Sequence, residues 1–335
     1  MYEAVEGFSE VIDELERILS GKVETPQWTL TGELITNPYP VLKDRGRVIR
    51  GIPIREENFH ELKVRSHDHR VLAVDASLKV LFDCGSFKIV ISKISCSIWC
   101  GRYRVFDFKP KLKIELVKSR LEAMEFLFNS ELEAVRSASS KLGPGDYCIL
   151  DRALMAIPAY KESTRKMLDR LCDYLSFRGI RLIGITKSSQ LEVNTGENLL
   201  GHLLHRSRDF IGDRAWYYYP IFRSSQYPKW YLGVITVVRF SADSDHVFRV
   251  DINRRDVNGI DVIDEYLSEV AYLQDPAIPG YPYPPKSCHD EAKIGRQELM
   301  CLKLSFLESL SRETRRRFIA NLKSTSFKEE ELWAK

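Results

Sequence analysis

The chain has 335 residues, of which 44% are hydrophobic and 29% charged, so it can bury one large core or two modest ones under a polar surface. Its net charge of +3 permits a nucleic-acid partner without indicating one. Seven cysteines without a C-x-x-C pair argue against a disulfide framework and a structural zinc site. The apolar stretches are too short to span a bilayer and the acidic N-terminus lacks a basic, apolar leader, so we expect a cytoplasmic protein without a membrane contact.

Three regions are predicted along the chain. Residues 1–65 should form an accessory region, with an amphipathic helix over residues 1–20 followed by a Pro-containing segment. Residues 66–311 carry the alternating strand and helix patterns of one central domain. Residues 312–335 should form a charged C-terminal helix.

The central region begins with strand-like runs at 70–76, 86–99 and 103–108, whose short connections predict an antiparallel meander. Helical periods at 114–140, 161–178 and 195–211 then alternate with short apolar strands at 147–152 and 180–186. Further strands are expected near 215–221, 230–240 and 246–253, and helices near 258–273 and 288–310. This order predicts an α/β fold with a ribonuclease H-like core, a mixed sheet in which helical crossovers add parallel strands beside the meander.

Two carboxylates end apolar runs that the pattern predicts to be buried strands. Asp75 follows Val71-Leu72-Ala73-Val74, and Asp151 follows Tyr147-Cys148-Ile149-Leu150. A right-handed crossover would place these strands side by side, where two carboxylates repel unless a cation lies between them. Each residue alone also fits a simpler interpretation, Asp75 as a turn cap through Ser77 and Asp151 as a helix N-cap or ion-pair partner of Arg152. Their matching positions favour a divalent metal ion.

A two-metal site for phosphoryl transfer needs a third carboxylate, which the predicted helix at 114–140 should supply. An apolar stripe runs along this helix through Val117, Leu121, Met124, Leu127, Phe128, Leu132 and Val135. Glu131 falls inside the stripe and is our first choice of ligand, while Glu133 is the alternative if the helix is shifted and Glu125 lies at the edge. Glu131 also fits a boundary residue that reaches solvent past the core.

Two further side chains are candidates for contact with phosphate or water. His289 follows a Pro-rich segment and should lie at the start of a helix capped by Ser287, where it could contact phosphate, a metal ion or water. The spacing alone favours a simple ion pair there with Asp290 or Glu291. Lys187 follows the apolar strand at 180–186, so its ammonium should lie at the same sheet edge as Asp151 or extend into solvent.

Together these segments resemble the NurA nuclease family over about residues 70–300. The resemblance rests on Val74-Asp75-Ala76-Ser77, Gly145-Asp146-Tyr147-Cys148-Ile149-Leu150-Asp151-Arg152-Ala153-Leu154, Ile185-Thr186-Lys187-Ser188, Arg249-Val250-Asp251-Ile252, and Gly280-Tyr281-Pro282-Tyr283-Pro284 followed by His289. It implies metal-binding carboxylates at Asp75, Glu131 and Asp151, with His289 matching the C-terminal histidine of the family. The family usually has Asp-Gly-Ser or a close variant at both aspartates, whereas this chain has Ala76 and the bulky, charged Arg152 after them.

The resemblance implies a manganese-dependent nuclease, with magnesium as the alternative ion, that degrades DNA from 5′ ends and cuts single strands during DNA end resection and repair. It further implies single-stranded DNA and double-stranded ends as substrates, a homodimer, and a HerA-type hexameric translocase as partner. In the two-metal mechanism, one ion would activate water and the other would stabilise the leaving oxygen, with His289 and Lys187 assisting at the phosphate.

Two other functions fit the same residues. The first is a catalytically impaired adaptor that binds DNA and the translocase and has lost turnover because of Arg152. The second is a different nuclease of the same ribonuclease H-like architecture, with RNA or four-way junctions as substrates. Aromatic residues from Trp216 to Tyr219 fit either base stacking or packing of a strand. The basic run Arg312, Arg315, Arg316 and Arg317 fits either DNA contact or a solvated helix face.

Overall fold

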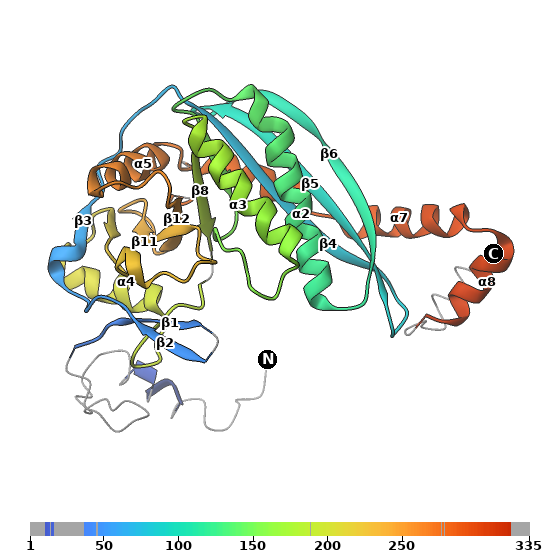
Figure 1. The fold of residues 1–335 in the computed structure, drawn as a ribbon, viewed down its shortest axis with the longest axis horizontal. Helices are drawn as coiled ribbons and strands as arrows, with labels where there is room; N and C mark the ends of the chain where they lie inside the picture. Colours follow the sequence, from blue (N-terminus) through green and yellow to red (C-terminus); the bar gives the residue numbers. More distant parts are fainter. Residues whose placement is uncertain are drawn as a thin grey trace, which may run out of the picture.

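A nine-stranded mixed sheet forms the centre of the computed structural model, which describes residues 11–13, 15–16, 37–44, 46–187, 189–275, 277 and 279–322. The strand order is β3-β10-β11-β12-β8-β7-β4-β5-β6 (Figure 1). These strands are β3 (Phe59–Glu61), β4 (Arg70–Asp83), β5 (Lys88–Cys100), β6 (Tyr103–Val117), β7 (Tyr147–Leu150), β8 (Arg181–Thr186), β10 (Trp216–Tyr218), β11 (Gly233–Arg239) and β12 (Phe248–Asn253). A smaller sheet contains β2 (Arg47–Arg50), β1 (Pro40–Asp44) and β9 (Glu192–Val193).

Seven α-helices are described around the sheets. They are α2 (Arg120–Ala138), α3 (Glu162–Phe177), α4 (Leu199–Phe210), α5 (Ile260–Tyr272), α6 (Tyr283–Ala292), α7 (Arg296–Ser309) and α8 (Arg312–Ala320), with short 3₁₀ turns at 56–58, 139–141 and 224–226. Figure 1 shows α2 and α3 side by side over one face of the sheet, while α7 and α8 extend away from it. Within the described residues, no helix is both long and apolar enough to cross a membrane.

The predicted mixed sheet is confirmed. Strands β4, β5 and β6 pair antiparallel as a meander, and β7 and β8 are added parallel to β4 through α2 and α3. Parallel neighbours need a crossover long enough to hold a helix, which explains why the two short apolar strands alternate with helical segments in the sequence.

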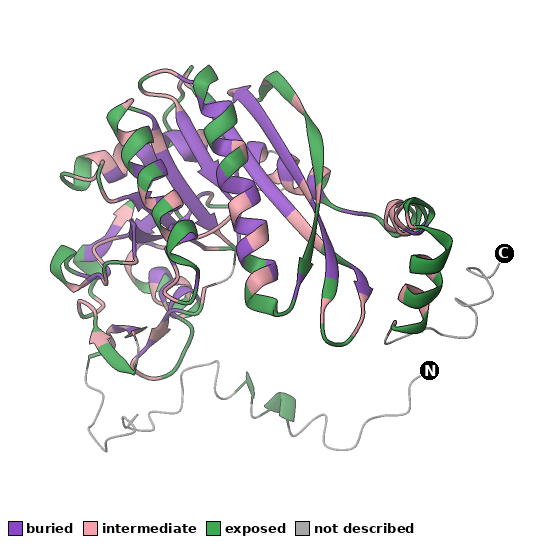
Figure 2. Cartoon of the chain, turned by 45° about the vertical axis from the view of Figure 1, so that its right-hand side comes forward, coloured by how far each residue is buried: buried purple, intermediate pink, exposed green. Residues whose placement is uncertain are grey.

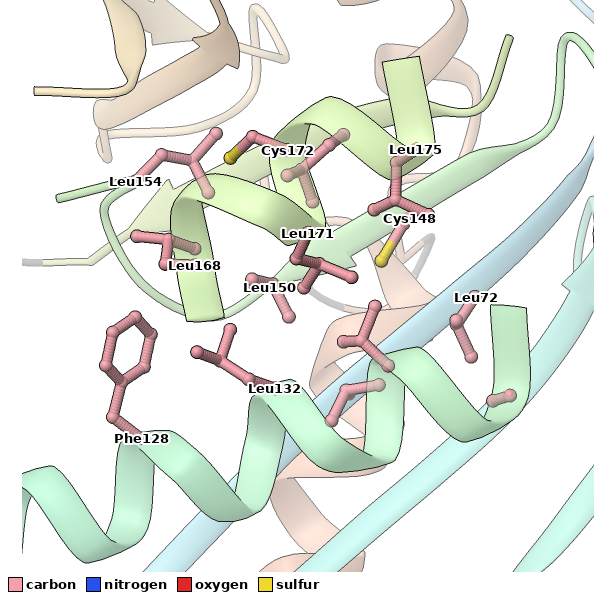
Figure 3. Packing of buried hydrophobic residues seen from close by; sticks show 14 of the residues in the cluster. Leu72, Phe128, Leu132, Cys148, Leu150, Leu154, Leu168, Leu171, Cys172 and Leu175 are labelled. Atoms are coloured by element: carbon pink, nitrogen blue, oxygen red, sulfur yellow. The ribbon is translucent and has the colours of Figure 1, made fainter. Parts of the chain in front are cut away.

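The main core lies between the sheet and the helices α2 and α3. Figure 3 shows Phe128 and Leu132 of α2 facing Leu168 and Leu171 of α3, with Leu150 of β7 beside them. These side chains are at most 5% exposed, and burying each one contributes about 1.5–3 kcal/mol. On the other face, α5 packs Leu267 and Val270 against the strands. The central strands are therefore covered on both faces, and Figure 2 shows them as mostly buried.

One predicted boundary is wrong at the start of α2. The sequence predicts a helix from residue 114, but β6 continues to Val117 and pairs with Lys88 of β5, and α2 begins at Arg120 after the N-cap Ser119. The side chains Leu112, Ile114 and Leu116 alternate as in a strand and lie directly before the apolar stripe, so the two patterns adjoin without a break. Leu121 and Met124, expected on the buried stripe, are exposed instead.

The predicted helix at 288–310 is also wrong, because the structure has two helices there. Helix α6 begins at Tyr283, with prolines in its first turn, where a missing N–H costs no helical hydrogen bond. Ser287 is therefore not an N-cap, and His289 lies in the last turn of α6 rather than at a helix start. A break at residues 293–295 separates α6 from α7.

The predicted helix at 1–20 lies almost entirely outside the described residues. Residues 59–61 of the predicted accessory region form β3, which pairs with β10 in the main sheet. The domain boundaries at residues 65 and 311 stay predictions.

Candidate metal centre

The register of two parallel strands brings Asp75 and Asp151 together. Val74 of β4 pairs with Leu150 of β7, and each aspartate is the next residue along its strand direction. Asp75 does not end its strand, contrary to the expectation from sequence, because β4 continues to Asp83. Its carboxylate accepts a hydrogen bond from the N–H of Ala76 at 2.8 Å, and Ser77 also lies within β4, so the turn-cap interpretation is wrong.

Helix α6 adds His289 to this pair. The imidazole Nδ1 lies 2.8 Å from Asp75 Oδ2 and 3.6 Å from Asp151 Oδ2. Each of the three residues offers one ligand atom, and these atoms all lie within 4.8 Å of one another. Two carboxylates and an imidazole form a donor set suited to Mn²⁺ or Mg²⁺, so the residues present fit a divalent ion.

Polar contacts fix α6 against the meander and so position His289. The thiol of Cys288 donates to the carbonyl of Ala73 at 3.3 Å, and Ser95 Oγ donates to Glu291 Oε2 at 2.8 Å. Ser77 also hydrogen-bonds to the carbonyl of Ala292, the last residue of the helix. These contacts lie on both sides of His289 along the helix and restrict its movement relative to Asp75.

The electrostatics of Asp75 favour a bound cation. Asp75 is 8% exposed, and burial raises the pKa of its carboxyl group, with a further increase from the nearby charge of Asp151. The hydrogen bond from His289 opposes this increase. Two carboxylates in a desolvated site gain stability from a positive charge between them.

Asp151 is held by two side chains besides His289. Lys187 Nζ donates to its Oδ2 at 2.7 Å, and the Tyr281 hydroxyl donates to its Oδ1 at 3.0 Å. Burial raises the pKa of Tyr281, and the charge of Asp151 adds to this, so the phenol stays protonated and remains a donor. The sequence singled out Lys187 but assigned no role to Tyr281, although its motif, Gly280-Tyr281-Pro282, lies just before α6.

Glu131 lies near Asp75 and Asp151, but its carboxylate pairs with Arg152. Its Oε1 accepts from Arg152 Nη2 at 2.7 Å, and Arg152 Nε contacts the other carboxylate oxygen. Burial raises the pKa of Glu131 to about 7, and the charges of Asp75 and Asp151 act in the same direction against the pull of Arg152. The structure therefore places Glu131 within the field of both aspartates but not among the three converging donors.

Two other glutamates of α2 that the sequence singled out, Glu133 and Glu125, lie in different surroundings. Glu133, the alternative ligand from the sequence, is exposed and pairs with Lys113 of β6. Glu125 is buried and accepts a hydrogen bond from the N–H of Lys161 at 2.6 Å. Within the described part of the chain, neither belongs to the group of donors that converges at Asp75 and Asp151.

Two contacts hold the loop after Asp151, and the sequence suggested no role for the residues that make them. Asp251 is fully buried, pairs with Arg249 at 2.7 Å, and accepts a hydrogen bond from the N–H of Leu154 at 2.9 Å. Gly184 of β8 allows the carbonyl of Arg152 to approach closely, because a Cβ at this position would lie 2.2 Å from that oxygen. Both contacts hold the backbone that carries Asp151 and Arg152.

Three of the four aromatic residues from Trp216 to Tyr219 offer no stacking surface for bases. Trp216, Tyr217 and Tyr218 are at most 2% exposed in β10, so the strand-packing interpretation applies to them. In the basic run of α8, Arg317 is exposed and forms an ion pair with Glu313 of the same helix, as expected for a solvated helix face.

A family model described as the NurA domain matches residues 69–294 of this chain. The chain belongs to the NurA family. The crystal structure of the NurA nuclease from Sulfolobus solfataricus has a similar fold, with a TM-score of 0.56 and 15% identity over 75% of this chain and 88% of that one. A NurA structure bound to dAMP and manganese has a TM-score of 0.55 and 11% identity over 94% of this chain and 99% of that one. A search of curated proteins by sequence gave no match.

The matched NurA region contains all residues of the candidate centre, from Asp75 to His289. The fold shared with NurA structures confirms the fold class that the order of strands and helices predicts. Membership of the NurA family together with this fold supports a nuclease.

Proposed function

We propose that this NurA-family chain is a metal-dependent deoxyribonuclease that hydrolyses phosphodiester bonds. The observation that carries the proposal is the convergence of Asp75, Asp151 and His289, whose ligand atoms lie within 4.8 Å of one another where β7 ends beside its parallel neighbour β4. Buried carboxylates in this arrangement are costly unless they bind a cation, and a divalent ion is the usual one in phosphoryl transfer.

Each residue of the candidate metal centre has its own role in the proposed reaction. A divalent ion, Mn²⁺ or Mg²⁺, supplies Lewis-acid activation of the phosphate and of the attacking water when bound. Asp75, Asp151 and His289 would hold it. The imidazole of His289 is fixed by Asp75 through Nδ1 and is partly exposed, so from this position it can also orient water or the scissile phosphate. Lys187, which is also partly exposed, can neutralise charge that develops on the phosphate.

The resemblance to the NurA family supports a more specific proposal. We extend the proposal to degradation of DNA from 5′ ends and to cutting of single strands, in DNA end resection in the cytoplasm. The same source supports a homodimer that acts with a HerA-type hexameric translocase. The two-metal arrangement would additionally require Glu131, which pairs with Arg152.

Cleavage of labelled DNA tests the proposal. Linear double-stranded DNA labelled at the 5′ or the 3′ end, and circular single-stranded DNA, should be degraded with Mn²⁺ and not with EDTA. Asp75→Asn should abolish the reaction, whereas the matched variant Asp290→Asn, which changes an exposed aspartate beside His289 that pairs with Lys293, should not. Preference for RNA or for four-way junctions in a competition assay would contradict the DNA-end substrate.

A catalytically impaired DNA-binding adaptor is the second candidate. The specific observation that favours it is the ion pair between Arg152 and Glu131, which engages the glutamate expected to bind metal. Absence of cleavage by the native chain, alone and with the translocase, together with retained DNA binding, would support the adaptor.

A further inference from the structure

Arg152 and Glu131 form a closed ion pair beside the metal centre. The guanidinium contacts both carboxylate oxygens, through Nη2 at 2.7 Å and through Nε. The side chain of Glu131 is 4% exposed and that of Arg152 is 19% exposed. A contact that uses both oxygens leaves the carboxylate poorly placed to bind a metal ion as well.

Aromatic packing holds the guanidinium over the carboxylate. Its carbon atom Cζ lies 4.6 Å from the centroid of the Phe128 ring, one helical turn before Glu131 on α2. Phe128 is itself buried in the core, so the guanidinium makes a cation–π contact with a ring that has little freedom to move. The backbone of Arg152 is fixed as well, because its carbonyl packs against Gly184. Release of Glu131 would leave a mostly buried guanidinium without its carboxylate, which is unfavourable.

The charges of the centre also favour a single ion. When Glu131 is ionised, Asp75, Asp151 and Glu131 supply three negative charges, and Arg152 and Lys187 supply two positive ones. One divalent ion therefore leaves a small positive charge that a substrate phosphate can balance, whereas two ions would leave a much larger one. The three ligand atoms within 4.8 Å of one another suffice for the first ion.

We propose that Arg152 keeps Glu131 out of metal coordination, so that this centre binds one divalent ion at Asp75, Asp151 and His289 and Arg152 supplies the second positive charge. The inference rests on the proposed metal-dependent nuclease and specifies its metal stoichiometry. Arg152 is thus a positioning residue, which acts through Glu131 and through the charge that it places beside the two aspartates.

Titration of the full chain with Mn²⁺, followed by electron paramagnetic resonance of the free ion, tests the proposal without relying on activity. The native chain should bind one ion. Asp75→Asn should weaken binding by at least about tenfold, whereas Glu131→Gln, which keeps the size of the side chain, should change the dissociation constant by less than about threefold. Arg152→Ala should free Glu131 and allow a second ion to bind, and the double variant Arg152→Ala with Glu131→Gln should return to one.

The outcomes separate this inference from the proposed function. No binding of Mn²⁺ to the native chain, or binding that Asp75→Asn leaves unchanged, would overturn the metal centre and with it the metal-dependent nuclease. Two ions in the native chain, a tenfold loss on Glu131→Gln, or one ion in Arg152→Ala would overturn only the role of Arg152. If thermal unfolding shows that Arg152→Ala does not fold, the comparison of Glu131→Gln with the native chain still decides the question.

Discussion

The ammonium of Lys187 lies 2.7 Å from Oδ2 of Asp151, the same carboxylate oxygen that lies 3.6 Å from His289 Nδ1. Lys187 therefore occupies the side of Asp151 that faces the other metal donors. A cation in this position competes with a metal ion for the carboxylate, and after metal binding it is placed to attract a phosphate.

Replacement of Lys187 by alanine should separate metal binding from turnover. Mn²⁺ should bind a few times more tightly because the competing ammonium is gone, while DNA cleavage at saturating Mn²⁺ should fall about a hundredfold because the phosphate loses a charge partner. Calorimetric titration and single-turnover cleavage measure the two effects. Lys166→Ala, an exposed lysine of α3 that pairs with Glu162, is the control and should change neither. Weaker Mn²⁺ binding by Lys187→Ala would contradict this role.

Asp75→Asn should leave the metal-free protein as stable as the native chain or more stable. Burial and the charge of Asp151 raise the pKa of Asp75, which means that its ionised form is unfavourable in the fold, and asparagine removes that charge at constant volume. Mn²⁺ should raise the melting temperature of the native chain, since it binds the folded state, but not that of the variant. A large loss of stability in EDTA would instead indicate that Asp75 has a structural role.

The metal-free stability should depend on pH through Glu131. Its pKa is raised from 4.5 to about 7 by burial, so the folded state holds a proton that the unfolded state has lost between these values. The contribution of Glu131 is therefore fully present below about pH 4.5 and is lost as the pH rises towards 7, on the order of 3 kcal/mol. Urea unfolding in EDTA from pH 4.5 to 7.5 measures it as the difference between the native chain and Glu131→Gln. A difference that does not change with pH would contradict the raised pKa.

Tyr281→Phe should lower cleavage about tenfold while the fold is retained. The variant removes only the hydroxyl that donates to Asp151 Oδ1, so the carboxylate loses an orienting partner but keeps Lys187. Cleavage rates at several Mn²⁺ concentrations are the measurement. The same rate as the native chain at every concentration would show that this hydrogen bond does not orient Asp151.

Gly184→Ala should destabilise the protein by about 1–3 kcal/mol, because the new methyl group would collide with the carbonyl of Arg152. The shift of that carbonyl should also reduce cleavage, since the same loop carries Asp151. Gly201→Ala is the matched control within α4, where an added Cβ meets nothing within 4 Å and alanine favours the helix. Urea unfolding of both variants is the measurement, and equal stabilities would contradict the close contact.

The sequence patterns alone predict that the strands carrying Asp75 and Asp151 are neighbours in the sheet. The apolar runs before Asp75 and Asp151, with a helical segment between them, imply adjacent parallel strands, and the register of Val74 with Leu150 agrees. The position of His289 within its helix was wrong, since local patterns do not show that two prolines can begin a helix.

The environments of Glu131 and Tyr281 could not be predicted in the same way. Glu131 was found from its place on the apolar stripe, but its partner Arg152 lies 21 residues further along the chain. Tyr281 is 130 residues from Asp151. Such contacts depend on how distant segments pack, which neither periodicity nor spacing reports.

The hydrogen bond between Asp75 and His289 joins positions 214 residues apart in the chain. During translation, Asp75 and Asp151 are made long before α6, and at ordinary rates the ribosome needs roughly 10–40 seconds for that interval. A nascent or truncated chain that lacks α6 therefore has the two aspartates without their histidine. The order of segments in the gene thus delays assembly of the candidate metal centre until nearly all of the NurA-matched region has been synthesised.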